Sequence, residues 1–418
     1  MPANAISRLA RFGISALVVL GIALCIHVKN ILGLAAVLLL LLGIGLLFFK
    51  RWRPLLNSQE KILIAVFAAH FAAQLLALWV AGFDEEATSK LERTWLLVSV
   101  IPVYFAINAI KLSALVLWGS AIGGAVLASV LASYEVFFLE EYRADGSTNA
   151  IIYGNICVVF ACISLASLPW FNLHLRNWRW LPFIGLGCGI FAAVLSASRG
   201  SWVALLVVLL CFAFIHRHYF KRRQLLVGGV FAIIAILLAW NHLQILSDRM
   251  SSAFVSLSHY SDAPIDDPVR GESANRRLEM WQASWKIFVD SPFLGAGLGN
   301  FRQLAQEQVE QGLRHPYTAL HENPHNQFIS TLVSGGLIGL GTLCAVMLLP
   351  LLIFYRTLSH PDTELASLSV GGTVFVLAFA TGMLTDSLLE RSLAATFFLV
   401  VLALTLALHR IRLRTIES

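Results

Sequence analysis

The sequence predicts an all-α polytopic membrane protein with about twelve transmembrane helices. Hydrophobic residues make up 58% of the 418 residues and charged residues only 13%, whereas a soluble domain has about 25% charged residues. Apolar runs of about 20 residues recur along the chain, which is enough for a helix to cross a hydrocarbon core of about 30 Å. The sequence lacks the alternating segments of about 10 residues that are typical of a transmembrane barrel.

Twelve apolar runs are the expected spans, and they divide the chain into three parts. They lie near 12–28, 31–49, 61–82, 94–110, 112–133, 149–170, 181–197, 201–216, 224–241, 326–355, 365–385 and 392–409. Residues 1–241 hold spans one to nine, residues 242–324 form a large helical loop, and residues 325–418 hold the last three spans. No small-residue cleavage site follows the first run, so we expect a retained helix rather than a signal peptide. The tenth span is long, and we expect it to tilt or to begin above the membrane surface.

The distribution of Lys and Arg predicts the orientation of the spans. With the N-terminus in the cytoplasm, the inside segments hold 17 of these residues and the short outside connections hold six. Cytoplasmic loops carry the excess of Lys and Arg in membrane proteins. We therefore expect both termini in the cytoplasm and the 242–324 loop outside. The net charge of +6 then reflects topology, and we expect no nucleic-acid partner.

The external loop is predicted to contain two helices and a connector. Four apolar side chains at helical spacing are expected on one face of the first helix: Leu278, Trp281, Trp285 and Phe288. This helix should stop at Asp290-Ser291-Pro292, and a second, polar helix should cover Phe301 to Gln311. Ser261 to Gly271, with two prolines and three aspartates, is expected to be a flexible connector.

The six cysteines all fall inside apolar runs, and none lies in the polar loop. This placement argues against a disulfide framework and against thiolate metal sites.

Arg199 lies in the short outer connection between spans seven and eight, within Ser-Ala-Ser-Arg-Gly-Ser. A cation at this end of a helix runs against the charge bias and costs free energy if it is partly buried. Ser198 and its small polar neighbours would allow a ligand to approach closely. The alternative is that Arg199 extends to lipid headgroups.

Arg277 precedes Trp281 by one helical turn, so its guanidinium is expected on the membrane-facing side of the loop helix. An arginine there requires an anionic partner. The alternative is a structural ion pair with Glu279 or Glu272. Arg276 is the second choice if the helical register differs by one residue.

His321-Glu322-Asn323-Pro324-His325 matches the zinc-protease pattern H-E-x-x-H. That site needs both histidines on one turn of an intact helix, and Pro324 disfavours helical geometry there. We therefore expect no metal, and we interpret His325 as a group at the outer surface where span ten begins. Imidazole has a pKa of about 6.5, which suits a general base; the alternative is a capping or packing histidine.

Gly295 to Asn300 contains three glycines but lacks the G-x-G-x-x-G spacing and a preceding strand. We expect a turn there, and no dinucleotide or other cofactor.

These motifs together resemble the membrane O-antigen ligase and polymerase superfamily, which includes bacterial protein O-oligosaccharyltransferases. The resemblance is carried by residues 196–200, Arg277 to Trp281, Pro292 to Phe301, and His325-Asn326. It implies a GT-C-like, inverting, metal-independent glycosyltransferase in the bacterial inner membrane. Its implied donor is a glycan on undecaprenyl diphosphate, used at the periplasmic face in lipopolysaccharide maturation.

The number of spans and the position of the loop most resemble the ligase that caps lipid A–core oligosaccharide. An O-antigen polymerase or a protein O-oligosaccharyltransferase is the alternative within the superfamily. In this interpretation Arg199 and Arg277 hold the diphosphate and His325 is the catalytic base, with Asp386 or Glu390 in reserve. The further substrate-binding residues are expected to be Arg276, Ser198, Asn326, Lys90 and Arg93.

A transporter for a lipid or solute is the alternative from a different class. The same arginines could bind an anionic headgroup. Transporters often show repeated halves or helices broken at the midplane. The sequence shows no repeat, and its candidate charges gather at one surface.

Overall fold

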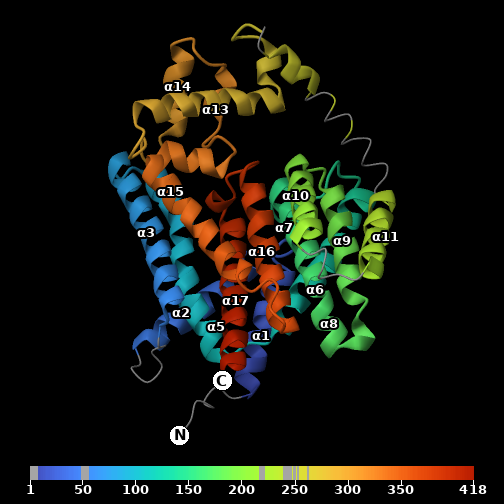
Figure 1. The fold of residues 1–418 in the computed structure, drawn as a ribbon. Coiled ribbons are helices and arrows are strands. Elements are labelled where there is room, and N and C mark those ends of the chain that lie inside the picture. The colour runs from blue at the N-terminus through green and yellow to red at the C-terminus, as the bar shows by residue number, and fades with distance from the viewer. Residues whose placement is uncertain are drawn as a thin grey trace.

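The structure is a computed structural model that describes residues 8–48, 56–215, 222–238, 247, 251, 254–260 and 263–418. These ranges contain helices and no strand, which confirms the all-α prediction. Figure 1 shows a bundle of long helices with a smaller helical domain at one end. The helix α1 begins at the opposite end, and α17 finishes there too. The boundary predicted at residue 241 lies outside the described residues.

A helix occupies every range in which a span is predicted. These helices are α1 (Arg8–Ala23), α2 (Ile31–Phe48), α3 (Ser58–Ala81), α5 (Val100–Ile110), α6 (Ala114–Ser133), α7 (Ala150–Ala166), α9 (Leu181–Leu195), α10 (Arg199–Ile215), α11 (Arg222–Leu238), α15 (Gln327–Tyr355), α16 (Thr363–Met383) and α17 (Ser392–Glu417). In the described chain, seven helical segments are long and apolar enough to cross a membrane. An eighth results if α7 and α8 (Leu168–His174), bent by 42°, form one span. Four further apolar helices are shorter, so the protein is polytopic and the count of twelve stays a prediction.

The last two helices form the centre of the bundle. In the most apolar stretches of α16 and α17, 89% of the residues are buried inside the protein, compared with 39% in that of α3 and 33% in that of α15. A helix that is hydrophobic all round requires apolar surroundings on every side. Protein supplies these surroundings for α16 and α17, whereas α3 and α15 leave much apolar surface for lipid.

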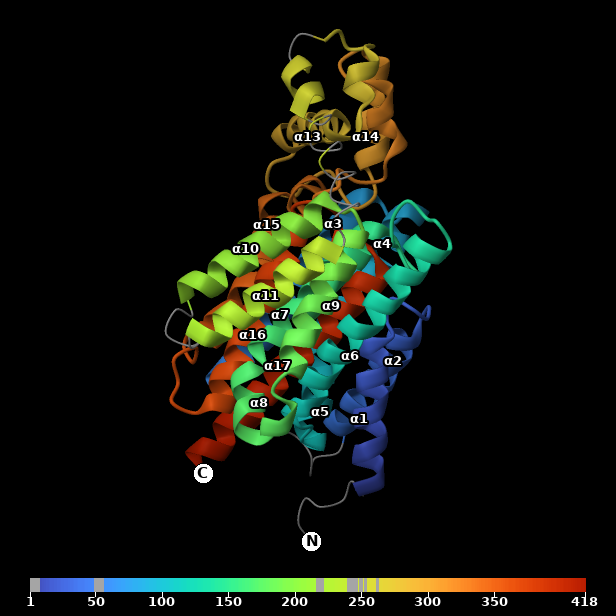
Figure 2. The same cartoon turned by 90° about the vertical axis from the view of Figure 1, so that its right-hand side faces the viewer.

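The domain beyond the bundle is built on α13 (Ser273–Asp290) and α14 (Phe301–Glu310), and the side view places both above the ends of α15 and α3 (Figure 2). Both loop helices therefore form where predicted. The predicted apolar face of α13 is wrong, because Trp285 is 62% exposed. Its buried side instead presents Met280 and Ile287 to Phe301 on α14, since α14 packs on that side.

Part of the expected flexible connector is folded. Pro268–Gly271 forms the 3-10 turn η5, and the Asp267 side chain accepts a hydrogen bond from the Val269 amide at its start. Arg270 Nη1 lies 2.7 Å from Oε1 of the buried Glu279, so an ion pair ties this turn to α13. The composition of the segment predicted a flexible connector, because composition does not reveal the ion pair between Arg270 and Glu279.

The glycine-rich segment forms the predicted turn and joins the outer domain to the bundle. Gly295, Gly297 and Gly299 all have positive φ. The amides of Ala296 and Gly297 donate to the carbonyls of Val333 and Ser334 at 2.8 and 3.1 Å. These carbonyls lie beside a break in α15 at Gly336, where φ is 59°. The long tenth span is therefore broken.

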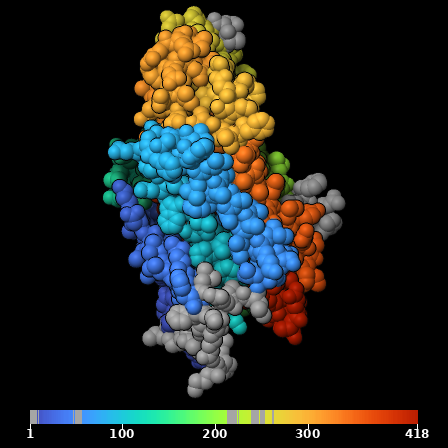
Figure 3. All heavy atoms as spheres, turned by 90° about the vertical axis from the view of Figure 1, so that its left-hand side faces the viewer, coloured from blue at the N-terminus to red at the C-terminus, as the bar shows by residue number. Residues whose placement is uncertain are grey.

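The same turn also contacts α3. The Leu298 amide donates to the Ala77 carbonyl at 3.1 Å, and a Cβ at Gly297 would lie 2.7 Å from the Ala81 nitrogen. Figure 3 shows α3 and α4 (Glu85–Thr94), in blue, directly beneath the orange outer domain. Close backbone packing of this kind requires glycine and holds the outer domain over the bundle.

Candidate active site beneath the outer domain

The predicted site residues lie where the outer domain meets the bundle. Arg199 begins α10, and Arg277 is in the second turn of α13. His325 precedes α15, and Asp386 lies in the turn between α16 and the 3-10 helix η7 (Leu388–Glu390). Four separate elements thus supply the candidate groups, which is typical of a site that binds a ligand between domains.

His325 is held in a tight, non-helical turn. Its φ is 50°, in the left-handed region that non-glycine residues seldom adopt, and its amide donates to Oδ1 of Asn323 at 3.1 Å. Asn326 begins α15 and accepts hydrogen bonds from the amides of Phe328 and Ile329. The turn confirms that the H-E-x-x-H pattern is not helical.

His325 pairs with Asp386. His325 Nδ1 lies 2.9 Å from Asp386 Oδ1, with the carboxylate side chain 2% exposed and the imidazole 23% exposed. Burial raises the pKa of the Asp386 carboxyl, but the hydrogen bond from His325, the charge of Arg391 and the hydrogen bond from the Ser387 amide bring the pKa below its usual value. An ionised Asp386 accepts the proton of His325 Nδ1. We infer that His325 Nε2 carries a lone pair, as a general base requires.

His321 faces that lone pair. Its Nδ1 lies 3.3 Å from His325 Nε2. Burial, followed by nearby positive charge that includes Arg276 and Arg302, lowers the pKa of His321, so its imidazole is neutral at pH 7 and can donate from Nδ1. Trp281 Nε1 donates to the Pro324 carbonyl at 3.0 Å and fixes the turn from above. The two histidines face each other, and no group of three or more His, Cys, Asp or Glu in the described residues forms a metal-ligand set.

Arg277 points toward Asp386 and Arg199. Burial lowers the pKa of the Arg277 guanidinium; the charge of Asp386 raises it and that of Arg199 lowers it further. Within the described chain, no hydrogen bond or ion pair reaches this half-buried guanidinium. The expected alternative, an ion pair with Glu279, does not form, because Glu279 pairs with Arg270. An anion between Arg199 and Arg277 would relieve their mutual repulsion.

Gly200 explains how Arg199 reaches this position. A Cβ at Gly200 would overlap the side chain of Thr385, so only glycine lets the first turn of α10 contact the turn that carries Asp386. Arg199 Nη2 also donates to Ser273 Oγ at the start of α13, at 3.2 Å. This contact links the bundle to the outer domain.

Arg276 occupies a different environment from its neighbour. Its guanidinium carbon lies 5.2 Å from the centre of the Tyr317 ring, in the outer domain. The charges of Asp386 and Arg199 act on Arg277, whereas Arg276 lies at Tyr317 and its charge acts on His321.

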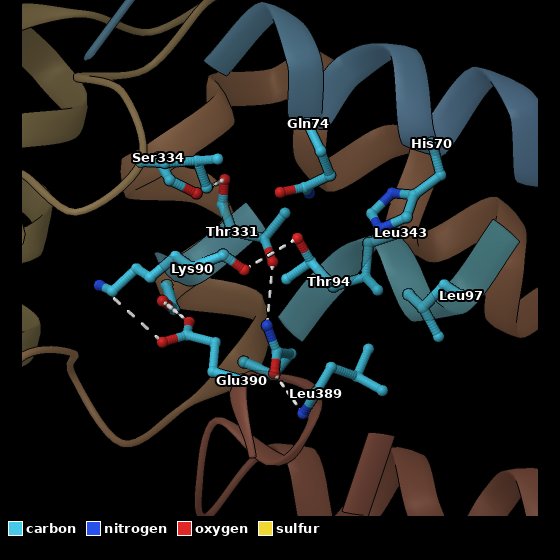
Figure 4. A pocket seen from close by; sticks show the side chains of 13 residues that line it. His70, Gln74, Lys90, Thr94, Leu97, Thr331, Ser334, Leu343, Leu389 and Glu390 are labelled. Carbon is cyan, nitrogen blue, oxygen red and sulfur yellow. Dashed lines mark hydrogen bonds and ion pairs between the residues drawn. The ribbon is translucent and has the colours of Figure 1, made fainter. Parts of the chain in front are cut away.

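Other predicted substrate-binding residues contact the protein itself. Lys90 is buried, donates to the Glu322 carbonyl at 2.8 Å and lies 3.9 Å from Glu390, as Figure 4 shows for the carboxylate. Arg93 donates to Ser89 at 3.3 Å. Asn326 Nδ2 donates to the Leu384 carbonyl at 3.1 Å. Ser198 is 4% exposed and adjoins Arg199, but its hydroxyl has no hydrogen-bond partner in the described chain.

Glu390, the other reserve base, braces the histidine turn. Its carboxylate accepts from Ser330 Oγ and from Asn323 Nδ2, the latter at 3.1 Å. These bonds and Lys90 leave it engaged on several sides, within the polar cavity drawn in Figure 4. Sequence reasoning missed this bracing and the His321 contact. The only sequence signal was Asn-Pro before His325, which is typical of a turn.

Comparison with known proteins identifies this region. Residues 183–344 match the sequence model of a family described as O-antigen ligase. These residues are therefore similar to an O-antigen ligase domain. The match includes α10, the outer domain and the first part of α15, and so Arg199, Arg277 and His325. This confirms the resemblance stated above.

A relative from Haemophilus influenzae, described as an uncharacterized protein, is 21% identical over 366 residues. The alignment covers 86% of this chain and 90% of the relative, so the similarity extends beyond the residues that match the family model. The family and the apolar helices together indicate a membrane glycosyltransferase of the O-antigen ligase and polymerase type.

Proposed function

We propose that this protein transfers O-antigen glycan from undecaprenyl diphosphate to lipid A–core oligosaccharide at the periplasmic face of the inner membrane. The proposal rests on two pairs of side chains that lie close together and differ in chemistry. One is the His325–Asp386 pair at 2.9 Å. The other is Arg199 and Arg277, which approach from the bundle and from the outer domain.

The arginine pair suits the leaving group. Breaking the bond between the anomeric carbon and its phosphate oxygen leaves both electrons on the lipid diphosphate. Two guanidiniums from different elements can bind phosphate oxygens through paired hydrogen bonds and stabilise this developing charge. The partly buried setting of Arg277 strengthens such an interaction. This electrostatic role requires no metal ion.

The His325–Asp386 pair suits the nucleophile. The acceptor hydroxyl takes the place of His321 at His325 Nε2 and gives its proton to that nitrogen as its oxygen bonds to the anomeric carbon. Asp386 keeps the proton of Nδ1 in place and stabilises the imidazolium that forms. A single displacement from the face opposite the diphosphate inverts the anomeric configuration.

The position of the site supports the proposed compartment. Arg277 belongs to α13 of the outer domain, and the charges of Asp386 and Arg199 act on it. The outer domain and the C-terminus lie at opposite ends of the bundle (Figure 1). With the excess of Lys and Arg on the cytoplasmic side, the site faces the periplasm. A diphosphate anchored by its lipid in the outer leaflet would reach Arg199 and Arg277 there.

The test uses purified protein in detergent with a defined lipid-linked glycan and lipid A–core acceptor. Mass spectrometry should detect the joined product with the wild type and much less with His325→Ala. A transporter would form no product, because detergent leaves no second compartment. Product on a growing glycan or a protein instead of on lipid A–core would overturn the acceptor assignment.

A further inference from the structure

A pocket of about 680 Å³ opens in the outer domain next to the proposed arginine pair. Its rim carries Asp266, Glu272, Ser273, Arg276 and Tyr317. It therefore combines two carboxylates, two hydroxyls and a guanidinium. None of these five is assigned a role in the proton transfer or the leaving-group step.

The part of the pocket formed by Tyr317 has a fixed shape. The Tyr317 ring stacks on the buried His315, with 4.9 Å between centres and 17° between planes, and the amide of Tyr317 donates to His315 Nδ1 at 3.2 Å. A Cβ at Gly271 would overlap the Tyr317 ring, so glycine lets η5 pack against it. Such packing fixes the polar groups in place before a ligand arrives.

The two carboxylates have no structural task that would explain them. Glu272 stands at the N-terminal boundary of α13 but caps it with no side-chain hydrogen bond. The neighbouring Asp267 does cap η5, whereas the Asp266 side chain makes no hydrogen bond or ion pair in the part of the chain described. Both Asp266 and Glu272 are exposed on the pocket rim.

The mixture of groups selects a class of ligand. Two carboxylates repel a phosphate, and Arg276 repels a cation. A neutral ligand rich in hydroxyls would satisfy both, because carboxylates accept from hydroxyls and a guanidinium donates to them. The apolar faces of Tyr317 and Pro316 at the pocket suit the carbon side of such a ligand. Carbohydrate has this chemistry.

Ser273 joins this pocket to the proposed leaving-group site. Its hydroxyl accepts from Arg199 Nη2 at 3.2 Å while it also lines the pocket. The adjacent Arg276 and Arg277 have different neighbours. Arg276 lies at Tyr317 in the pocket, and the charge of Asp386 acts on Arg277. A sugar chain attached to a diphosphate at Arg199 would therefore start beside the pocket.

We propose that this pocket is a subsite for the sugars of the lipid-linked donor that follow the one attached to the diphosphate. The inference rests on the proposed function for the identity of the donor. It adds that the enzyme recognises the glycan chain itself, through Asp266, Glu272, Arg276 and Tyr317.

The test compares Asp266→Ala/Glu272→Ala with the control Glu307→Ala/Glu310→Ala. The control removes two exposed carboxylates from α14, so the net charge of the two variants is equal. Transfer is measured with a one-sugar donor and with a donor of several repeats. The pocket variant should raise KM for the long donor about tenfold, equivalent to ~1.4 kcal/mol. Its KM for the one-sugar donor, its KM for the acceptor and its kcat should stay unchanged.

Equal effects on both donors, a raised acceptor KM, or a pocket variant that matches its control would overturn the subsite. A second measurement does not need transfer: titration of the protein with the free oligosaccharide of one to three repeats. Binding should weaken about tenfold in the pocket variant and stay unchanged in the control, and the absence of binding in the wild type would contradict the subsite. A wild type that binds the oligosaccharide but joins no glycan would instead refute the proposed function.

Discussion

Replacing Asp386 by asparagine probes the proposed base with little change of shape. Asp386 Oδ1 lies 2.9 Å from His325 Nδ1 and also accepts from the Ser387 amide at 2.9 Å. An amide oxygen can keep the second bond but carries no charge to stabilise an imidazolium. Asp386→Asn therefore tests electrostatics and tautomer rather than packing.

The expected size of the effect follows from two contributions. A hydrogen bond to a charged group contributes ~1.5–3 kcal/mol, and each ~1.36 kcal/mol is tenfold in rate, so the lost charge costs roughly 10- to 150-fold. An asparagine N–H facing His325 Nδ1 would also move the imidazole proton to Nε2, which removes the lone pair. In the serine-protease triad the equivalent change costs about 10⁴-fold. We expect kcat to fall by roughly 10²–10⁴.

The assay is single-turnover transfer by purified protein at saturating donor. Donor binding should be unchanged, because the diphosphate is assigned to the arginines. The double variant Asp386→Asn/His325→Ala should transfer glycan at about the same rate as His325→Ala alone, because the two residues act as one unit. Wild-type turnover in Asp386→Asn, or losses that multiply in the double variant, would refute the pairing.

The lowered pKa of Asp386 determines how its contribution to the free energy of unfolding changes with pH. Its folded pKa is lowered below the usual carboxyl value of 3.8. The stability that this ionised group contributes is therefore present above the unfolded pKa and is lost as pH falls through the folded pKa. In thermal unfolding, the stability difference between the wild type and Asp386→Asn should therefore shrink as pH falls below 3.8, and a difference that stays the same there would contradict the lowered pKa.

Four further predictions follow from the same geometry. Arg199→Ala and Arg277→Ala should each lower both kcat and donor affinity in turnover and binding assays, and lysine should rescue only partly because it cannot bind phosphate in the bidentate way. His321→Ala should keep the rate within about threefold, because the acceptor hydroxyl displaces the His321 N–H from His325 Nε2; a loss as large as that of His325→Ala would assign proton transfer to His321. Gly336→Ala should lower Tm, because its Cβ would overlap the Phe293 carbonyl and its φ is 59°, whereas Gly341→Ala, with open space at its Cβ, should not. Transfer should survive EDTA; activity lost to the chelator and restored by a divalent ion would contradict the metal-free mechanism.

Hydropathy predicted the helices because burial in lipid or in the bundle requires long apolar runs. It could not predict that α15 breaks at Gly336, because the break depends on the turn at Gly295 and its hydrogen bonds to Val333 and Ser334. It also gave the wrong buried face for α13. Trp285 was expected on the buried face, but contact with α14 buries Met280 and Ile287 instead.

The candidate site was predictable as a set of residues but not as a set of contacts. Arg199 and His325 stood out because each lies at the outer end of an apolar run, and Arg277 stood out because it precedes Trp281 by one turn of the loop helix. The sequence placed Asp386 as a replacement for His325, whereas the structure makes it the hydrogen-bond partner. Lys90 was expected at the substrate, yet it pairs with Glu390, which lies 300 residues later in the sequence. Such long-range pairs depend on packing, which local patterns do not encode.

The most direct test of the central proposal is the stoichiometry and stereochemistry of a single reaction. Purified protein, lipid-diphosphate-linked glycan and lipid A–core oligosaccharide are mixed in detergent, and the released lipid diphosphate and the new anomeric linkage are determined together. One lipid diphosphate should be released for each glycan joined, with the anomeric configuration inverted. Retention of configuration, or diphosphate release without a joined glycan, would contradict the account.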